Sequence, residues 1–167
     1  GGGGIATDGG GNALITGWAE STNFPVSPGA FQTSYGGGGP SWGDAFVMKL
    51  DTSGDTLWAT YLGGSDNEEG FGIAVDVNNN IFVCGDTYSG NFPATAGVFQ
   101  PANGAGAIPE DNYMVKFDPN GNLMCGTYLG GDGHDEMVAG GTIAVFGGLV
   151  YMTGGVPSPG NYPVTAG

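Results

Sequence analysis

The sequence contains no arginine and only two lysines, against 16 acidic residues, and its formal net charge is −14. A protein that binds nucleic acid needs a cationic surface to contact the phosphates, and two lysines cannot form one. No apolar run approaches the roughly 20 residues of a membrane-spanning helix. The composition therefore predicts that nucleic acid is not a partner and that the chain does not insert directly into a membrane.

Cysteine and histidine are also scarce. Cys84 and Cys125 are too few for a disulfide scaffold, and with a single histidine, His134, they fit no zinc motif. Abundant Asp, Asn, Gly and Thr with almost no cationic side chain is typical of secreted or surface proteins. The negative charge would attract divalent cations, which makes calcium the one cofactor that we consider.

Glycine, by contrast, accounts for 37 of the 167 residues, and no stretch shows the 3.6-residue periodicity of a helix. The strongest signal is an internal repeat. Tyr61-Leu62-Gly63-Gly64 returns 67 residues later as Tyr128-Leu129-Gly130-Gly131, in register with several other motifs. The repeat divides the chain into two full copies, residues 1–69 and 70–137, and a partial third copy, residues 138–167, that holds the first two strands.

Each full copy predicts four short strands joined as two hairpins. In the second copy these are residues 72–76, 81–84, 113–117 and 123–129, with a long loop between the second and the third strand. Two hairpins in about 67 residues are typical of one four-stranded antiparallel blade of a β-propeller. Stacked blades bury their faces against one another, and we expect the core between blades to contain Ile73, Val75, Phe82, Val115 and Phe117.

The same strand order separates the two cysteines, because the third strand lies between Cys84 and Cys125. Their Cα atoms should then be about 9–10 Å apart, whereas a disulfide needs less than about 7 Å. We therefore predict two free and mostly buried thiols.

The copies resemble the bacterial SBBP-type β-propeller repeat. The matching segments are residues 72–76, 23–25, 29–32, 44–50 and 60–64, and the third copy departs from the pattern at residues 145–149. The resemblance implies an all-β fold of propeller blades on a large secreted or bacterial cell-surface protein, and it implies no catalytic residues. A propeller needs about four to eight blades. We expect the two and a half blades here to be part of a larger propeller, with the remainder of a longer chain as their partner.

Acidic residues recur at equivalent positions and have two interpretations. They lie in the hairpin turns and in pairs after the Tyr-Leu-Gly-Gly motif, where they could bind local N–H groups and cap the connections, or bind calcium. The calcium candidates are Glu68, Glu69, Asp135, Glu136, Asp51 and Asp118. The two lysines, Lys49 and Lys116, occupy one repeat position, which predicts a structural role in pairing with a turn carboxylate such as Asp51 or Asp118.

The long loops, residues 18–43 and 86–112, vary most between the copies and are the expected place of function. Their aromatic residues Trp18, Tyr35, Trp42 and Tyr88 are candidates for stacking on sugars. We expect a non-catalytic scaffold, spacer or adhesin that binds a surface protein or polysaccharide, with His134 as a surface loop residue. One alternative is a propeller enzyme acting on extracellular glycans, for which Glu110-Asp111 is the available unrepeated acid pair. The other is a calcium-stabilised structural element.

Overall fold

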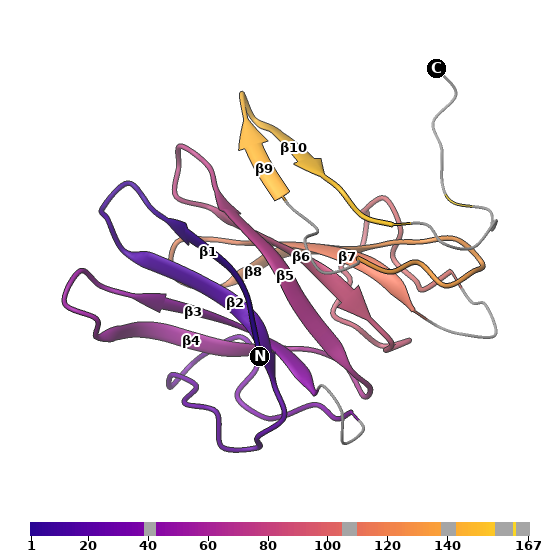
Figure 1. Cartoon of the computed structure of the whole chain (residues 1–167), viewed down its shortest axis with the longest axis horizontal. Helices are drawn as coiled ribbons and strands as arrows, with labels where there is room; N and C mark the ends of the chain where they lie inside the picture. Colours follow the sequence, from indigo (N-terminus) through magenta and orange to yellow (C-terminus); the bar gives the residue numbers. More distant parts are fainter. Residues whose placement is uncertain (39–42, 105–109, 138–142, 156–161, 163–167) are drawn as a thin grey trace.

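The computed structural model describes residues 1–38, 43–104, 110–137, 143–155 and 162 (Figure 1). These residues form ten β-strands and no helix, which confirms the all-β prediction. It follows that the described ranges hold no helix of the length and apolarity needed to cross a membrane.

The first copy folds into one antiparallel sheet in the order β1-β2-β3-β4. Its strands are β1 (Gly2–Thr7), β2 (Ala13–Ala19), β3 (Asp44–Leu50) and β4 (Thr56–Leu62). Burial alternates along β3 as the side chains alternate between the two faces of the sheet. We call this sheet blade 1.

The second copy forms an equivalent sheet, blade 2, in the order β5-β6-β7-β8. Its strands are β5 (Glu68–Val75), β6 (Ile81–Thr87), β7 (Asp111–Phe117) and β8 (Leu123–Leu129). Strands β9 (Ile143–Phe146) and β10 (Leu149–Met152) form a third, two-stranded sheet. The three sheets lie side by side like the leaves of a fan, with the β9–β10 hairpin beside β5 (Figure 1).

The strands of blade 2 begin or end outside the predicted ranges at the loop end of the blade. β5 begins at Glu68 and β6 continues to Thr87, so the acidic pair Glu68-Glu69 lies within a strand and faces the end of β6. A register shift between Gly70 and Gly72 marks a bulge that separates this extension from the predicted strand.

The hairpin turns are closed by their own aspartates, as the turn interpretation predicted. The Asp118 carboxylate accepts the N–H groups of Asn120 at 2.8 Å and Asn122 at 2.9 Å, and Asp51 binds its own turn in the same way. In the β5–β6 turn, Asn79 has a φ of 62°, a left-handed conformation that asparagine tolerates. Local hydrogen bonds therefore account for the conserved spacing of these acids within the repeat.

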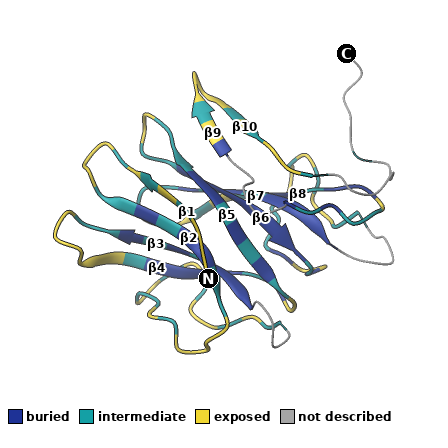
Figure 2. Cartoon of the chain, in the orientation of Figure 1, coloured by how far each residue is buried: buried dark blue, intermediate teal, exposed yellow. Residues whose placement is uncertain are grey.

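Two apolar clusters stack the sheets. The larger cluster lies between blades 1 and 2 and includes Leu14, Val47, Val83, Val115 and Phe117, all fully buried. The smaller one lies between blade 2 and the β9–β10 hairpin and contains Phe82, Cys84, Met137 and Ile143. Burial is densest along β6 of the middle sheet (Figure 2). The predicted core residues are confirmed, with Phe82 on the opposite face of blade 2 from the other four and Val75 only partly buried.

The lysine prediction is confirmed for Lys49 in the kind of partner, a turn carboxylate, but that residue is Asp8 and not Asp51 or Asp118. Lys49 forms a 2.9 Å ion pair with Asp8, in the β1–β2 turn of the same blade. Its ammonium group also donates to the carbonyl of Pro119 in blade 2 at 3.4 Å, and Trp58 Nε1 donates to the same carbonyl at 3.2 Å. Lys49 thus connects the β1–β2 turn of blade 1 with the β7–β8 turn of blade 2.

The cysteine prediction is confirmed in its main point. Both thiols are free, and β7 separates β6, which carries Cys84, from β8, which carries Cys125. Cys84 is fully buried, while Cys125 is only partly so. Burial raises the pKa of the Cys84 thiol to about 12.

Candidate functional site at the loop end of the blades

The long loop of blade 1 is fastened by a glutamine and a buried aspartate. Gln32 Nε2 and the Gly36 N–H donate to Asp44 Oδ2 at 2.9 and 2.8 Å, and Gln32 Oε1 accepts the Gly63 N–H at 2.9 Å. Asp44 is the first residue of β3 and is fully buried, and this burial raises its pKa against the lowering effect of its hydrogen bonds. The network joins the loop to the start of β3 and the end of β4.

Blade 2 repeats this network with Gln100 and Asp111. Gly104 donates to Asp111 at 2.8 Å, Gln100 Nε2 lies 3.5 Å from the same oxygen, and Gly130 donates to Gln100 Oε1 at 3.1 Å. Burial raises the pKa of Asp111 to about 6. Asp111 is therefore a repeated loop anchor, and of the predicted unrepeated acid pair only Glu110 is particular to blade 2.

The acids after the Tyr-Leu-Gly-Gly motif cap the connection into the following copy. Glu68 is fully buried, accepts the Gly64 N–H at 2.9 Å and the Thr87 hydroxyl at 2.6 Å, and has a pKa that burial raises to about 7. Asp135, equally buried, accepts the Gly131 N–H at 2.5 Å. Both acids therefore satisfy backbone N–H groups that the turn would otherwise leave unpaired.

The six calcium candidates are spread over separate places. Glu68 and Glu69 are successive residues of β5, so their side chains point to opposite faces of the sheet. In the part of the chain that the structure describes, no three His, Cys, Asp or Glu side chains come together as a metal site would require. Asp51 and Asp118 lie in hairpin turns, while Asp135 and Glu136 lie between β8 and β9.

Three of the four aromatic candidates contact the blades. Trp18 lies on β2 and meets the ring of Phe71 from blade 2 at 6.3 Å between centroids, while Tyr35 lies edge-on to Tyr61 at 5.9 Å. Tyr88 is half-buried and hydrogen-bonds the Glu110 carboxylate. Trp42 lies outside the described residues. The described three each keep part of their side chain exposed on the loop end.

Asp86, at the end of β6, lies near the carboxylates of Glu69, Glu110 and Glu136, and of these four acids Asp86 and Glu110 are particular to blade 2. Asp86 accepts the Met137 N–H through both oxygens, at 2.8 and 2.9 Å. Burial, together with the charges of Glu110, Glu69 and Glu136, raises its pKa to about 8 against the lowering effect of the Met137 hydrogen bond. The backbone that leads toward β9 is thus held by a carboxyl group that is largely protonated at neutral pH.

Glu110 links this acidic group to the surface. It is almost fully buried and forms an ion pair with Nε2 of His134, whose side chain is 30% exposed. Burial raises the pKa of Glu110, while its hydrogen bond with Tyr88 and its contact with His134 oppose that rise. His134 is therefore a half-exposed loop residue with a specific acidic partner, and sequence reasoning missed that partner.

The sequence indicates the acids near Asp86 through a difference between the two copies of the repeat. The positions of Asp86 and Glu110 are held in the first copy by Trp18 and Gly43, so the repeat itself marks both acids as additions to the blade. The contact of Glu110 with His134 could not be foreseen, because it joins segments on either side of β7 and β8.

A comparison with known families agrees with this geometry. The sequence model of a family described as a β-propeller repeat, SBBP, matches residues 57–93, from β4 through β5 and β6 into the second long loop. The chain carries an SBBP-type β-propeller repeat. The sheets around this SBBP repeat are accordingly propeller blades, each with four antiparallel strands and one long loop.

One curated protein with a similar sequence is an uncharacterized WD repeat-containing protein of Acanthamoeba polyphaga mimivirus. It is 31% identical over 85 residues, which cover 47% of this chain and 6% of that protein. The chain therefore spans only a small part of the length of the relative that it matches. Both comparisons support a propeller module built from repeats.

Proposed function

We propose that the chain is a non-catalytic, extracellular or bacterial cell-surface propeller module, a scaffold that binds neutral polysaccharide through its long loops. One observation carries this proposal. The residues that hold the long loops in place are the same in both copies, whereas the residues beside them differ between the copies. Gln32 and Asp44 hold one loop as Gln100 and Asp111 hold the other, whereas the aromatic and acidic residues beside them differ between the copies. A rigid frame with variable loops is a common design for binding.

The chemistry of the loop end favours sugars without charge. Partly exposed rings of Trp18, Tyr35 and Tyr88 offer faces for stacking on the apolar faces of sugar rings. The net charge of −14 would repel an anionic polymer.

Binding of the immobilised chain to soluble β-glucan, mannan and dextran tests the proposal. We expect at least one polymer to bind, and Tyr35→Ala or Tyr88→Ala to weaken it about tenfold, which corresponds to about 1.4 kcal/mol of stacking. Tyr151→Ala is the matched control, because Tyr151 is 53% exposed but lies on β10, outside the loops. Equal binding by all variants would contradict the proposal that the loops bind the polymer. If the chain bound only surface proteins and none of the polymers, the ligand would be a protein and not a polysaccharide.

The second candidate is a glycan hydrolase, favoured by the unrepeated acids around Glu110 and Asp86. Such an enzyme would use a carboxyl group with a raised pKa as a general acid. Release of reducing sugar from the same polymers, lost in Glu110→Gln, would support the hydrolase. The scaffold proposal expects no release from the unmodified chain.

Calcium stays a prediction for the acidic positions. If it stabilises the blades, addition of a chelator will lower the melting temperature of protein purified with calcium. The backbone hydrogen bonds of Glu68, Asp135, Asp51 and Asp118 favour the alternative, in which the melting temperature does not change.

A further inference from the structure

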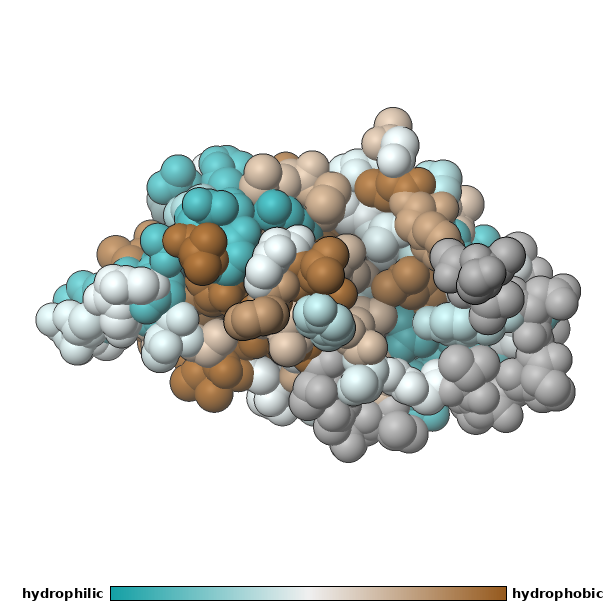
Figure 3. Space-filling model, turned by 90° about the horizontal axis from the view of Figure 1, so that it is seen from above, coloured by the Kyte–Doolittle hydropathy of each residue, from teal (hydrophilic) through white to brown (hydrophobic). Residues whose placement is uncertain are grey.

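An exposed ring is not in itself a sign of a binding site in this molecule. Seen from above, hydrophobic residues interrupt the polar surface in several places (Figure 3), and scattered apolar residues are normal on a protein surface. For Tyr88 there is a further observation, because the carboxylate of Glu110 binds its hydroxyl group. Glu110 is only 1% exposed. A buried acid therefore fixes the polar end of a half-buried ring.

Glu110 in turn depends on His134. Its Oε2 atom contacts Nε2 of His134, and no other described residue donates a hydrogen bond to this oxygen. A buried carboxylate oxygen without a donor is costly, so His134 stabilises the position of the Glu110 side chain. Tyr88, Glu110 and His134 come from three segments, which follow β6, precede β7 and follow β8. The three side chains thus form one chain of contacts across the loop end of blade 2.

The first copy contains a neutral version of the same contact. His134 corresponds to Asn67, and Glu110 corresponds to Gly43. Asn67 Oδ1 accepts the Gly43 N–H at 3.2 Å, so the same two positions meet in both blades. The meeting of these positions is therefore a property of the repeat. Only the second copy adds a carboxylate at this point, and that carboxylate reaches the hydroxyl group of Tyr88.

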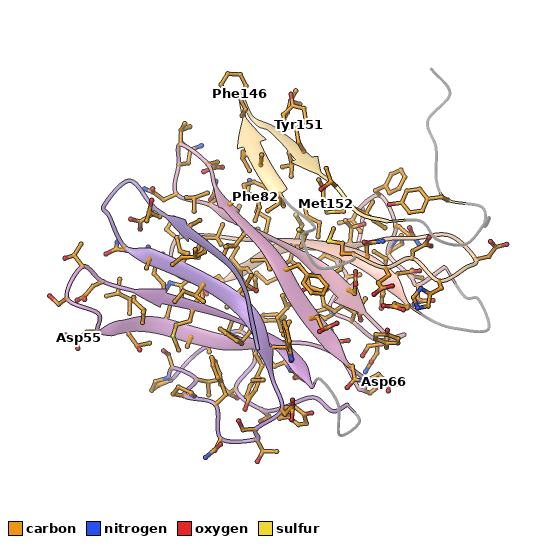
Figure 4. The ribbon with its side chains drawn as sticks, in the orientation of Figure 1. Asp55, Asp66, Phe82, Phe146, Tyr151 and Met152 are labelled. Atoms are coloured by element: carbon orange, nitrogen blue, oxygen red, sulfur yellow. The ribbon has the colours of Figure 1, made fainter. Side chains whose placement is uncertain are left out.

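The backbone of Tyr88 is held from the other side by blade 1. Its N–H donates to the carbonyl of Asn67 at 2.9 Å, and the next residue, Ser89, accepts the N–H of Asp66 at 2.8 Å through its hydroxyl group. Figure 4 shows Asp66 at this end of the strands and Asp55 at the opposite end. Blade 1 thus fixes the main chain of Tyr88, while Glu110 fixes the end of its side chain.

We propose that Glu110 and His134 are positioning residues for polysaccharide binding, which hold the ring of Tyr88 ready to stack on a sugar. The assignment rests on the proposed function, since Tyr88 is one of the rings through which that function binds the polymer. A ring that is held before binding loses less conformational freedom when the sugar arrives, and this raises affinity. Neither positioning residue has to touch the sugar, because His134 acts on Glu110 and Glu110 acts on the Tyr88 hydroxyl group.

A double-mutant cycle on binding to soluble β-glucan, mannan and dextran tests this coupling. Tyr88→Phe keeps the ring but removes its hydroxyl group, and His134→Ala removes the donor to Glu110. Each change should weaken binding about fivefold, the effect of one ordinary hydrogen bond. The double variant should lose no more than either single variant, because both changes break the same chain of contacts. Losses that multiply to about 25-fold would show that His134 acts independently of Tyr88, and would overturn the proposal.

A conservative variant separates positioning from a general loss of structure. In His134→Gln the amide Nε2 replaces the ring Nε2 as a donor to Glu110, so binding should stay within about twofold of the unmodified chain. Asp55→Asn is the control for a change of one charge, because Asp55 is exposed before β4, at the far end of blade 1, and binding should not change. A loss in His134→Gln as large as in His134→Ala would contradict the role of His134 as a donor.

Amide exchange without polymer distinguishes this assignment from the proposed function. His134→Ala should speed exchange at Tyr88 and in residues 89–104, but not in residues 20–38 of the first loop. If the unmodified chain binds none of the three polymers, the proposed function fails, and exchange still decides whether His134 holds Tyr88. Unchanged exchange at Tyr88 in His134→Ala, with the fold intact by circular dichroism, would overturn the positioning role even if the polymers bind.

Discussion

At the scale of single residues, Lys49 makes the most consequential contact of the two lysines. Its ammonium group is bound by Asp8 and by the carbonyl of Pro119 in the next blade, with 9% of the side chain exposed. Burial alone would raise the pKa of Asp8, but hydrogen bonds from Asn12 and the contact with Lys49 outweigh that effect and lower it. Through these two contacts, the Lys49–Asp8 ion pair of blade 1 is joined to the β7–β8 turn of blade 2.

Replacement of this lysine should be costly. We expect Lys49→Ala to lower the free energy of unfolding by about 3 kcal/mol, near the lower end for breaking a buried ion pair. The loss stays near that end because N–H groups of Gly10 and Asn12 still bind the Asp8 carboxylate. Urea denaturation followed by tryptophan fluorescence measures the change.

Lys116→Ala is the matched control for this measurement. Lys116 occupies the same repeat position but is only partly buried and lies 5.1 Å from the centre of the Phe82 ring. A cation–π contact of this kind contributes about 1 kcal/mol or less. If both variants lost the same free energy of unfolding, the contacts of Lys49 with Asp8 and Pro119 would contribute no more to stability than the contact of Lys116 with Phe82.

At the scale of elements, the long loops depend on a few side chains. Gln32 joins its loop to Asp44 and Gly63 at once, so Gln32→Ala leaves a buried carboxylate and a backbone N–H with fewer partners. We expect a loss of about 1–2 kcal/mol and faster amide exchange in residues 20–38. Thr33→Ala, at an exposed neighbouring position, should change neither quantity. Unchanged exchange in Gln32→Ala would mean that other contacts hold the loop.

The strands were predictable because the residue pattern of each strand occurs in both full copies of the repeat. Alternating apolar residues and Asp-Asn-Gly turns set β5 to β8, and the repeat aligned them with β1 to β4. The extension of β5 to Glu68 was not predictable, since it depends on a bulge at residues 70–72 and on pairing with Thr87. The partner of Lys49 was missed because Asp8 is distant in the sequence, and only the pairing of β2 with β3 brings its turn next to Lys49.

The candidate site was predictable only in part. The loops and their aromatic residues could be located from sequence, as could the unusual acid Glu110. Its contacts with Tyr88 and His134 join residues 22 and 24 positions apart, and the contact of Asp86 with Met137 joins residues 51 positions apart. These residues all belong to the second copy, and their contacts depend on how its long loop and the segment after β8 fold over the end of blade 2, which no local pattern encodes.

At the scale of the whole molecule, buried acids set the pH dependence of stability. Burial raises the pKa of Asp111 to about 6, of Glu68 to about 7 and of Asp86 to about 8. Protonation of these groups favours the folded state, so their contribution is complete below about pH 4 and is lost as the pH rises to about 8. Hydrogen bonds lower the pKa values of Asp76 and Asp118, and their contribution is lost as the pH falls below about 4.

The melting temperature should therefore be highest at about pH 4–5 and fall toward pH 8, as scanning calorimetry across pH 3–9 would measure. Asp86→Asn keeps an oxygen for the Met137 N–H and removes the titrating group, so it should flatten the fall between pH 6 and about 8. A melting temperature that rises steadily from pH 5 to pH 8 would contradict the assignment of these carboxyl groups as buried.

The sheets of the molecule stack face to face, and the reactivity of Cys84 reports on this stacking. Its thiol is buried between blade 2 and the β9–β10 hairpin, whereas Cys125 is partly exposed beyond β7. The most direct measurement is the reaction rate of each thiol with a colorimetric disulfide reagent in the native protein, with the labelled cysteine identified by mass spectrometry. Stacked blades predict that Cys125 reacts, that Cys84 reacts only on unfolding, and that an oxidant forms no bond between them. Rapid labelling of Cys84, or a Cys84–Cys125 disulfide in the native protein, would contradict the stacked blades or their strand order.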